Sequence, residues 1–483
     1  MRIAALLLAL AAGGTALAST ACAARAPSAT SISPPAASTI SSAGAASDAL
    51  VARGCYRCLE HAYDAAASAT DHVRTFETAV LLVARSKELG LPYAPWLERA
   101  RASMPAGPDW ADYLSIVQGL RIDPLADDRD VILTDTMRNR ASAETVAGWR
   151  TDLASGAGSP LLRTYLELSL VCQYIVDDRN VTIATAVQRF PDVPLIDYRA
   201  GICGASQAPH LAAVRDAVPE FADVDFALGR YAVDIPQQPD QEEALRRFTS
   251  ARAAFPESPA ILASLADLRR DREEWADALE TYDAALALVP THRDALLGRV
   301  VTLSHLSRHE DAIAAATRVI ELGSWFTGEA YYWRAWNEYH LVRVDEARID
   351  TDRAKGLMHS ASVLVLSGMI EWHEHRLDES EAELQDALTL DAGQCEAAFL
   401  LGSVRADRRQ WASGAAAFEL AQRCYDLSVT LRRETIARIT MGAGSEEGKA
   451  RLIARQQRAM AEETQHRDEA AENAAQLQKR VGG

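Results

Sequence analysis

The chain has 483 residues, of which 48% are hydrophobic and 6% aromatic, and its formal net charge is −17. This length would suffice for two to four ordinary domains, and the hydrophobic share is enough to bury a core. The acidic excess argues against nucleic-acid binding, because phosphates require a surplus of Lys and Arg. It also argues against adsorption on anionic lipid through a polybasic patch.

The N-terminus has the features of an export signal. Arg2 precedes a short apolar run at residues 3–12, which is too short to cross a bilayer as a permanent helix. Residues 18–22, Ala-Ser-Thr-Ala-Cys, resemble a bacterial lipobox, although Ser19 stands where leucine is usual. The resemblance implies a signal peptide over 1–21 and lipidation of Cys22. Ordinary cleavage after Ala18 is the alternative.

A Ser/Ala/Pro-rich stretch follows over residues 22–47, with almost no charge or large apolar side chain. This composition is typical of a disordered tether. Ala23 stands where lipoproteins retained at the inner membrane typically have aspartate. The resemblance therefore implies an exported, periplasm-facing protein that is lipid-anchored, in the outer membrane rather than the inner one.

Residues 48–224 have apolar spacing of helical type and no sustained alternation typical of strands. Helices are expected around Asp48–Ser68, Asp71–Leu89, Ala143–Ala154, Pro160–Ile175 and Thr182–Phe190. Connectors rich in Gly and Pro separate them. We interpret this region as divergent helical hairpins that continue into the repeats described next; a separate helical domain is the alternative.

Small residues then recur with a fixed period. One column is formed by Ala244, Ala278, Ala312, Ala347, Ser380 and Gly414, at intervals of 34, 34, 35, 33 and 34 residues. A second column, with a similar period, is formed by Ala232, Ala266, Val300, Ala335, Gly368 and Gly402. Two such columns, each with helical apolar spacing, predict two amphipathic helices per unit.

Prolines close the first two of these units, at Pro256 and Pro290. The pattern resembles the tetratricopeptide repeat, a helix-turn-helix of about 34 residues. The resemblance covers residues 225–428 as six units, although the later units lack the closing proline. It implies an all-α, right-handed superhelical solenoid of helical hairpins, with a concave groove lined by the first helix of each unit.

After Cys424 the sequence predicts another helix to about Thr440, a break at residues 442–444 and a charged segment from 446 to 480. We interpret residues 429–483 as C-terminal capping helices, since solenoid ends need a polar outer surface. A coiled-coil arm is the alternative, with Ile453 and Met460 as its seam.

Six cysteines remain besides Cys22, and an even number in an oxidising compartment favours disulfides. Cys395 and Cys424 stand at adjoining ends of one predicted hairpin. Cys172 and Cys203 are about one unit apart, at equivalent points of neighbouring helices. Cys55 and Cys58, with His61 nearby, favour a structural disulfide over a metal site, a redox motif or free thiols, because both flanks are helical.

A further set of residues shares one face of the first helices. These residues are His305, Tyr332, Trp336, Tyr339, His340, Met369, Trp372, His373 and Phe399. By the resemblance, this face lines the concave groove where peptides bind. The alternative is that the rings pack between units. The histidines would charge below about pH 6.5.

No nucleophile elbow, phosphate loop, zinc motif or catalytic carboxylate pair is present in the sequence. We therefore expect no enzyme activity and no cofactor. The favoured function is a non-catalytic protein–protein interaction scaffold of the bacterial cell envelope, which binds a peptide segment or partner subunit in the groove. The alternative is a ligand- or metal-binding protein in which His305, His340 and His373 converge. The sequence names neither the partner nor the oligomeric state.

Overall fold

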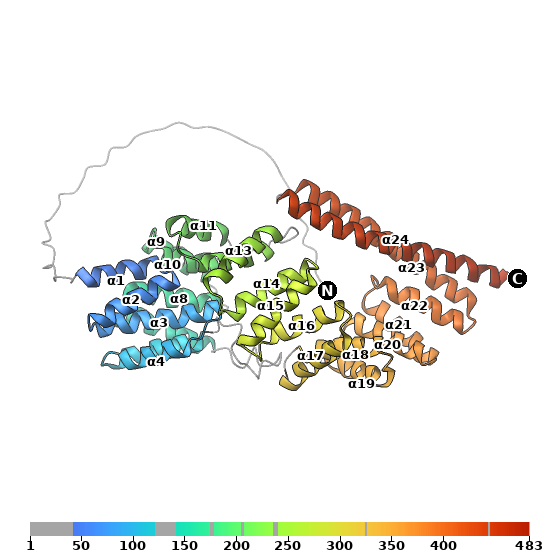
Figure 1. The fold of residues 1–483 in the computed structure, drawn as a ribbon, viewed down its shortest axis with the longest axis horizontal. Coiled ribbons are helices and arrows are strands. Elements are labelled where there is room, and N and C mark those ends of the chain that lie inside the picture. The colour runs from blue at the N-terminus through green and yellow to red at the C-terminus, as the bar shows by residue number, and fades with distance from the viewer. Residues whose placement is uncertain are drawn as a thin grey trace, which may run out of the picture. The chain divides into compact units, whose positions relative to one another are not determined.

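A computed structural model describes residues 42–120, 142–173, 178–203, 207–234, 240–323, 326–442 and 445–482. Cys22 and the rest of residues 1–41 lie outside these ranges. Throughout the described residues the secondary structure is helical, and successive helices pack as hairpins (Figure 1). The predicted all-α fold of paired helices is confirmed.

The N-terminal helices are α1 (Ser42–Arg53), α2 (Tyr56–Ser68), α3 (His72–Leu89), α4 (Ala94–Ser103), the 3-10 helix η1 (Pro108–Trp110), α5 (Ala111–Gly119), α7 (Ala143–Ser155), α8 (Pro160–Gln173), α9 (Arg179–Arg189), α10 (Pro194–Cys203) and α11 (Gln207–Ala217). The single helix expected over Asp48–Ser68 is divided into α1 and α2. Gly54 lies between them with φ of 71°, and an added Cβ would lie 2.5 Å from Cβ of Leu195. The left-handed backbone and this close approach end α1.

Six helical hairpins follow. Their helices are α12 (Asp223–Asp234) with α13 (Gln241–Ala254), α14 (Pro259–Asp271) with α15 (Trp275–Leu288), α16 (Arg293–His305) with α17 (His309–Leu322), α18 (Thr327–His340) with α19 (Val344–Leu357), α20 (Ala361–His373) with α21 (Leu377–Leu390), and α22 (Cys395–Asp407) with α23 (Trp411–Met441). Each small-residue column belongs to one helix of every pair, because the two helices approach closely there. At Gly402, for example, an added Cβ would lie 2.8 Å from the Phe418 ring.

Five turns between the two helices of a hairpin share one backbone conformation. Their left-handed residues are Glu273, Ser307, Val342, His375 and Arg409, with φ between 58° and 62°. In each turn the next residue donates its N–H to a carbonyl five residues earlier, at 2.8–2.9 Å, as Arg343 does to Glu338. This is the Schellman end of a helix, which satisfies carbonyls that the helix leaves free. The backbone conformation of these turns therefore repeats with the same period as the sequence.

The N-terminal helices and the first repeats share one hydrophobic core. A single cluster of buried side chains runs from Tyr56 to Leu268. At their boundary Tyr56 packs edge-on against Phe255, with ring centroids 5.9 Å apart. Ser258 donates its hydroxyl to the Leu89 carbonyl.

A buried ion network joins the N-terminal helices to the start of α12. The fully buried Arg85 pairs with Glu88 and Asp223, and its guanidinium carbon lies 3.9 Å from the Tyr198 ring centroid. Glu88 also accepts hydrogen bonds from Arg199 at 2.6 Å and from Tyr165 at 2.8 Å. Each buried charge therefore has a partner of opposite sign, which offsets its loss of hydration.

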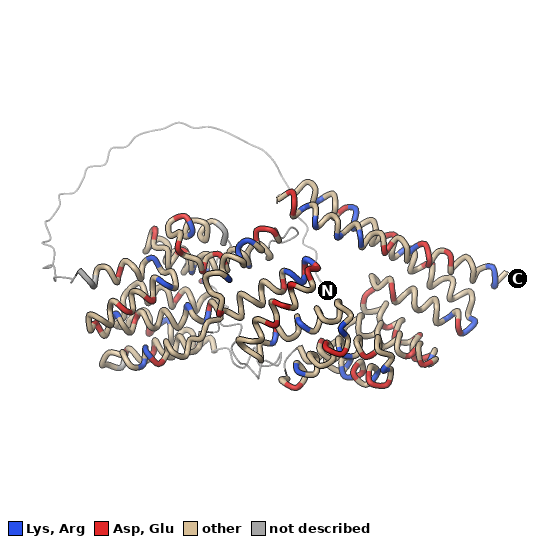
Figure 2. The backbone as a smooth tube through the Cα atoms, viewed as in Figure 1, with Lys and Arg blue, Asp and Glu red and all other residues tan. Residues whose placement is uncertain are grey.

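The C-terminal helices differ from the sequence-based expectation. The second helix of the sixth hairpin does not end near Cys424 but continues as α23 over 31 residues to Met441. α24 (Glu446–Gly482) then runs back along α23, and Ala470, Ala474 and Leu477 pack in a common cluster with Phe418. Both helices carry intermixed acidic and basic residues, as do the repeats (Figure 2).

The first part of α24 also contacts the early repeats. Arg451 pairs with Glu274 at 2.6 Å and with Glu242 at 3.3 Å. Arg455 and Arg458 pair with Glu273 at 3.1 and 2.5 Å. We call this set of ion pairs the α24 contact. It joins the C-terminal helix to α13 and to the turn between α14 and α15.

Candidate functional site

The residues predicted to line the groove lie on four first helices. Helix α16 carries His305, and α22 carries Phe399. Helix α20 carries Met369, Trp372 and His373. Helix α18 carries the remaining four, Tyr332, Trp336, Tyr339 and His340. We call these nine residues the aromatic face. The six aromatic and methionine side chains are half-buried and the three histidines are exposed.

The α18 residues form the centre of the aromatic face. The Trp336 ring meets the His340 ring edge-on at 4.7 Å between centroids. Tyr339 lies 6.0 Å from His340 and also 6.0 Å from His373 of α20, so it links adjacent units. Tyr332, Trp336 and Tyr339 pack on a buried cluster that includes Ala335 and Ile370. The rings therefore contact the core on one side and remain partly open on the other.

Trp372 and Phe399 also contact neighbouring helices. The indole Nε1 of Trp372 donates to Asp407 of α22 at 2.8 Å, which bridges the fifth and sixth units. Phe399 packs edge-on against Phe418 of α23 at 5.2 Å. Its ring thus belongs in part to the interior of the sixth hairpin.

The histidines do not converge on one point. His305 stacks on Trp275 at 4.2 Å and His340 stacks on His309 at 5.2 Å, whereas His373 lies beside Tyr339. Among the described residues, no group of three or more His, Cys, Asp or Glu is placed to hold a metal ion. The arrangement that the metal-binding alternative requires is thus not found in this part of the chain.

Partial burial against neighbouring rings changes the ionisation of several groups on this face, including two of the exposed histidines. It lowers the pKa of His305 and, together with the neighbouring His309, that of His340. Both imidazoles therefore become charged at lower pH than the ordinary value suggests. Burial raises the pKa of Tyr332, and the carboxylates of Glu396 and Glu329 add to this effect. Glu396 comes from α22, so the first helices bring residues two units apart into electrostatic contact.

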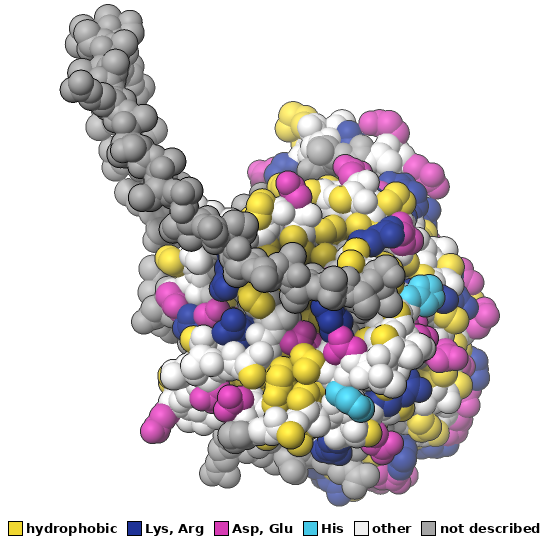
Figure 3. Space-filling view, turned by 90° about the vertical axis from the view of Figure 1, so that its left-hand side faces the viewer, with side chains coloured by type: hydrophobic (Ala, Val, Ile, Leu, Met, Phe, Trp, Pro, Cys, Tyr) yellow, Lys and Arg dark blue, Asp and Glu magenta, His cyan; other side chains and the backbone are white. Residues whose placement is uncertain are grey.

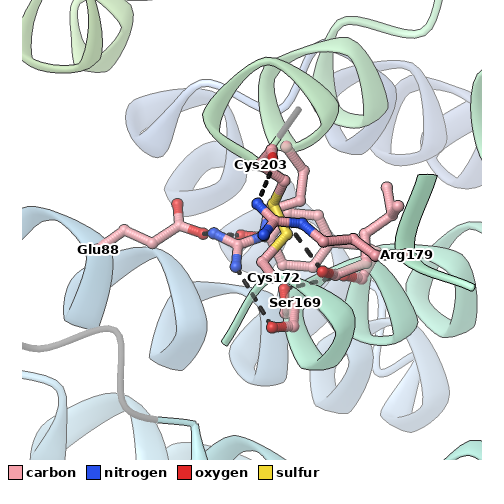
Figure 4. Close-up of a disulfide and its surroundings, with 8 residues drawn as sticks. Glu88, Ser169, Cys172, Arg179 and Cys203 are labelled. Atoms are coloured by element: carbon pink, nitrogen blue, oxygen red, sulfur yellow. Dashed lines mark hydrogen bonds and ion pairs between the residues drawn. A yellow bond between two sulfur atoms is a disulfide. The ribbon is translucent and has the colours of Figure 1, made fainter. Parts of the chain in front are cut away.

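The six described cysteines form three disulfides. Cys55 pairs with Cys58, Cys172 with Cys203, and Cys395 with Cys424, with Cα–Cα distances of 4.9, 5.2 and 5.3 Å. The bridge at Cys172 joins α8 to α10 (Figure 4). Around it, Arg179 donates to the Cys203 carbonyl, and Arg199 bonds to Glu88 and to the Ser169 carbonyl. The bridge therefore adjoins the buried ion network.

Sequence reasoning missed a cavity of about 600 Å³ among the N-terminal helices. Its lining includes Val51 of α1, Leu81 of α3, Leu161 of α8 and Phe190 at the end of α9. Figure 3 is a view of the side of the molecule that lies at the left in Figure 1. It shows hydrophobic side chains exposed between charged ones. The half-buried Glu77 accepts the Ser159 N–H at 2.6 Å at this cavity. No motif marks these residues, because four separate helices supply them.

Comparison with known proteins identifies the repeats. The sequence model of the tetratricopeptide repeat family matches residues 240–293 and 263–324. The chain contains tetratricopeptide repeats. The predicted resemblance is confirmed for these residues, and proteins built from such repeats bind protein and peptide partners. No curated protein matches the chain.

Several solved structures are similar over part of the chain. A repeat protein from Parabacteroides merdae is 17% identical, with 57% of this chain and 98% of that one covered and a TM-score of 0.38. Pseudomonas aeruginosa pilF is 16% identical over 42% of this chain and 92% of its own, with a TM-score of 0.38. YrrB, described as having an unusual peptide-binding site, is 21% identical over 37% and 91%, with a TM-score of 0.32.

None of the described helices is both long enough and apolar enough to cross a bilayer.

Proposed function

We propose that the protein is a non-catalytic interaction scaffold of the bacterial cell envelope, and that the aromatic face binds a peptide segment or partner subunit. Three features support the envelope location: the export-type N-terminus, the tether over 22–47 and the even number of cysteines besides Cys22. The six units over 225–428, with residues 48–224 before them and capping helices over 429–483, form the binding body of this proposal.

The observation that carries the proposal is the partial exposure of Trp336, Tyr339 and Trp372 on adjacent first helices. Tyr and Trp dominate the energetics of protein interfaces, since each combines a large apolar ring with a polar atom. Half-buried rings are also held in place before a partner arrives, which reduces the ordering cost of binding. The aromatic face therefore has the composition and the rigidity of a contact surface.

Partner capture tests the proposal. The wild-type protein and the Trp336→Ala variant are each crosslinked in native envelope, purified by affinity tag and analysed by mass spectrometry. We expect Trp336→Ala to weaken capture of the wild-type partner by about 2 kcal/mol, the scale of an interface hot spot. Trp411→Ala is the control, because Trp411 lies under Arg480 of α24 and not on the aromatic face.

Thermal melting separates binding from packing. Truncation of a core aromatic side chain costs about 3–5 kcal/mol of stability. Truncation of a half-exposed contact residue should cost much less. A Trp336→Ala protein that melts far below wild type yet still captures its partner would place the binding surface elsewhere.

The membrane attachment has its own test. We propose that Cys22 carries lipid in the outer membrane. The Cys22→Ser variant should then leave the membrane fraction, and the mass of the native N-terminal peptide should include the lipid. An unmodified chain that begins at Ser19 would contradict the anchor and leave the binding proposal intact.

A further inference from the structure

We propose that the segment bound by the aromatic face is positively charged: an extended peptide that places Lys or Arg side chains between the rings and the surrounding carboxylates. This inference rests on the proposed function and specifies the partner. It follows from three observations: carboxylates lie at the face, arginines of its helices pair with carboxylates of second helices, and its rings favour cations.

Three carboxylates lie at the aromatic face. Glu329 precedes Tyr332 on α18, and Glu396 comes from α22, and both act electrostatically on the Tyr332 hydroxyl. Asp407, also from α22, accepts the Trp372 indole N–H. Among the described residues, none of these three carboxylates forms an ion pair with Lys or Arg. The basic group that acts on Glu396 is His466 of α24, an imidazole rather than a permanent cation.

Three arginines of the same first helices, Arg299, Arg334 and Arg405, pair with carboxylates of second helices. Arg299 bonds to Asp283 at 2.6 Å and Arg405 bonds to Glu381 at 2.8 Å. Arg334 bonds to Asp350 at 2.9 Å. In each pair the carboxylate belongs to a second helix, so the positive charges are neutralised between helices. Within the described parts of the chain, these three arginines therefore do not pair with Glu329, Glu396 or Asp407.

The rings themselves favour cations. The face of an indole or phenol ring attracts a guanidinium or ammonium group, by about 0.5–2 kcal/mol. The molecule already uses this contact elsewhere, since Arg99 lies 4.3 Å from the Trp96 ring centroid and Arg480 lies 4.9 Å from that of Trp411. A basic side chain on the aromatic face would find both a ring and a carboxylate within one unit. An acidic peptide would meet like charges at Glu329, Glu396 and Asp407.

Peptide binding tests the inference on the full-length mature protein. The probe is a fluorescein-labelled peptide of three Lys-Leu-Ser-Arg repeats, and the matched probe has Glu in place of every Lys and Arg. Fluorescence anisotropy is measured at low and at physiological salt. We expect the basic probe to bind, to weaken as salt rises, and to bind tighter than the acidic probe.

Paired variants locate the contact. Glu396→Gln together with Asp407→Asn should weaken the basic probe about 5- to 30-fold, since each exposed charge pair contributes up to about 1 kcal/mol. Glu379→Gln together with Asp386→Asn, which removes two exposed carboxylates of the second helix α21, is the control for net charge and should leave affinity unchanged. Circular dichroism and melting of each variant exclude a folding defect.

The outcomes separate this inference from the function on which it rests. Equal binding of the two probes, no binding of the basic probe, or equal effects of the α21 control and the Glu396/Asp407 variant would overturn the basic-partner inference. If Trp336→Ala still abolished capture of the native partner in that case, the aromatic face would remain the binding surface. If Trp336→Ala left both capture and probe binding intact, the proposed function itself would fail.

Discussion

Glu338 of α18 is a carboxyl group in an unusual position. It is 8% exposed, and its Oε2 has no hydrogen-bond partner in the described structure. Burial, followed by repulsion from Asp350, raises the pKa of Glu338 to about 7, although Arg334 opposes the shift. At pH values between the ordinary pKa of a glutamate carboxyl group and about 7, Glu338 therefore keeps its proton in the folded protein and loses it in the unfolded chain. Folding stability from this group is present at low pH and is lost as the pH rises through about 7.

The Glu338→Gln variant should show this dependence. The neutral amide keeps the size of the side chain but cannot ionise, so the variant should melt above wild type at pH 8. The difference should shrink toward pH 5, where Glu338 is protonated. Glu321→Gln on the exposed surface of α17 is the control. Equal melting of Glu338→Gln and wild type at pH 8 would show that Glu338 loses its proton there without cost.

Among the structural elements, the turns between paired helices carry the clearest strain. Val342 has φ of 59° and is 68% exposed, so a β-branched residue occupies the left-handed region with little packing to compensate. That conformation costs an L-residue about 1–2 kcal/mol, and glycine avoids it at a smaller entropic cost. Val342→Gly should therefore stabilise the protein by about 0.5–1 kcal/mol.

Chemical denaturation measures this effect, and Val181→Gly is the matched control. Val181 is 67% exposed but lies within helix α9, where glycine should destabilise by about 0.5 kcal/mol. If both substitutions destabilised the protein equally, the left-handed turn at Val342 would not be strained.

The disulfide between Cys395 and Cys424 ties the start of α22 to the middle of α23. Such a bridge contributes about 2–4 kcal/mol, so the double variant Cys395→Ser/Cys424→Ser should melt earlier than wild type. Non-reducing peptide mapping of the native protein should recover the crosslinked peptide. Alkylation of both cysteines as free thiols would contradict the pairing.

The hairpins could be predicted because one physical cause acts in every unit. Small residues such as Gly402 mark the places where helices touch, and so the period is visible in the residues themselves. The turn at Val342 was not predictable in this way, since neither glycine nor asparagine marks its left-handed residue. The continuation of α23 through Cys424 was missed because its packing partner, α24, comes later in the chain.

The candidate site was predictable as a set of positions and not as a set of contacts. Helical spacing places Trp336 and Tyr339 on one face of α18, and the structure places both there half-buried. The bond from Trp372 to Asp407 and the packing of Phe399 on Phe418 depend on neighbouring helices. Side chains with alternative partners cannot be assigned from spacing alone.

In the whole molecule, the α24 contact is a connection that should respond to solution conditions. Its arginines are between 36% and 61% exposed, and exposed ion pairs contribute about 0.2–1 kcal/mol each and weaken with salt. Arg455→Glu/Arg458→Glu should therefore increase hydrogen exchange in residues 445–460 and in the turn at Glu273. Lys479→Glu, near the other end of α24, should not.

High salt should reproduce the exchange pattern of that double variant in the wild-type protein. Exchange that remains slow in residues 445–460 under both conditions would show that packing on α23 holds this part of α24, and that the ion pairs add nothing measurable.

The same contact has a consequence for the order in which the chain folds. Packing between neighbouring hairpins joins residues a few tens of positions apart, whereas the bonds from Arg451, Arg455 and Arg458 to the early repeats span 177 to 185 positions. Local contacts form quickly and distant ones slowly, because the intervening chain must first be ordered. The repeats can therefore assemble from either end before α24 docks. Refolding of this protein should end in a late step whose rate depends on ionic strength.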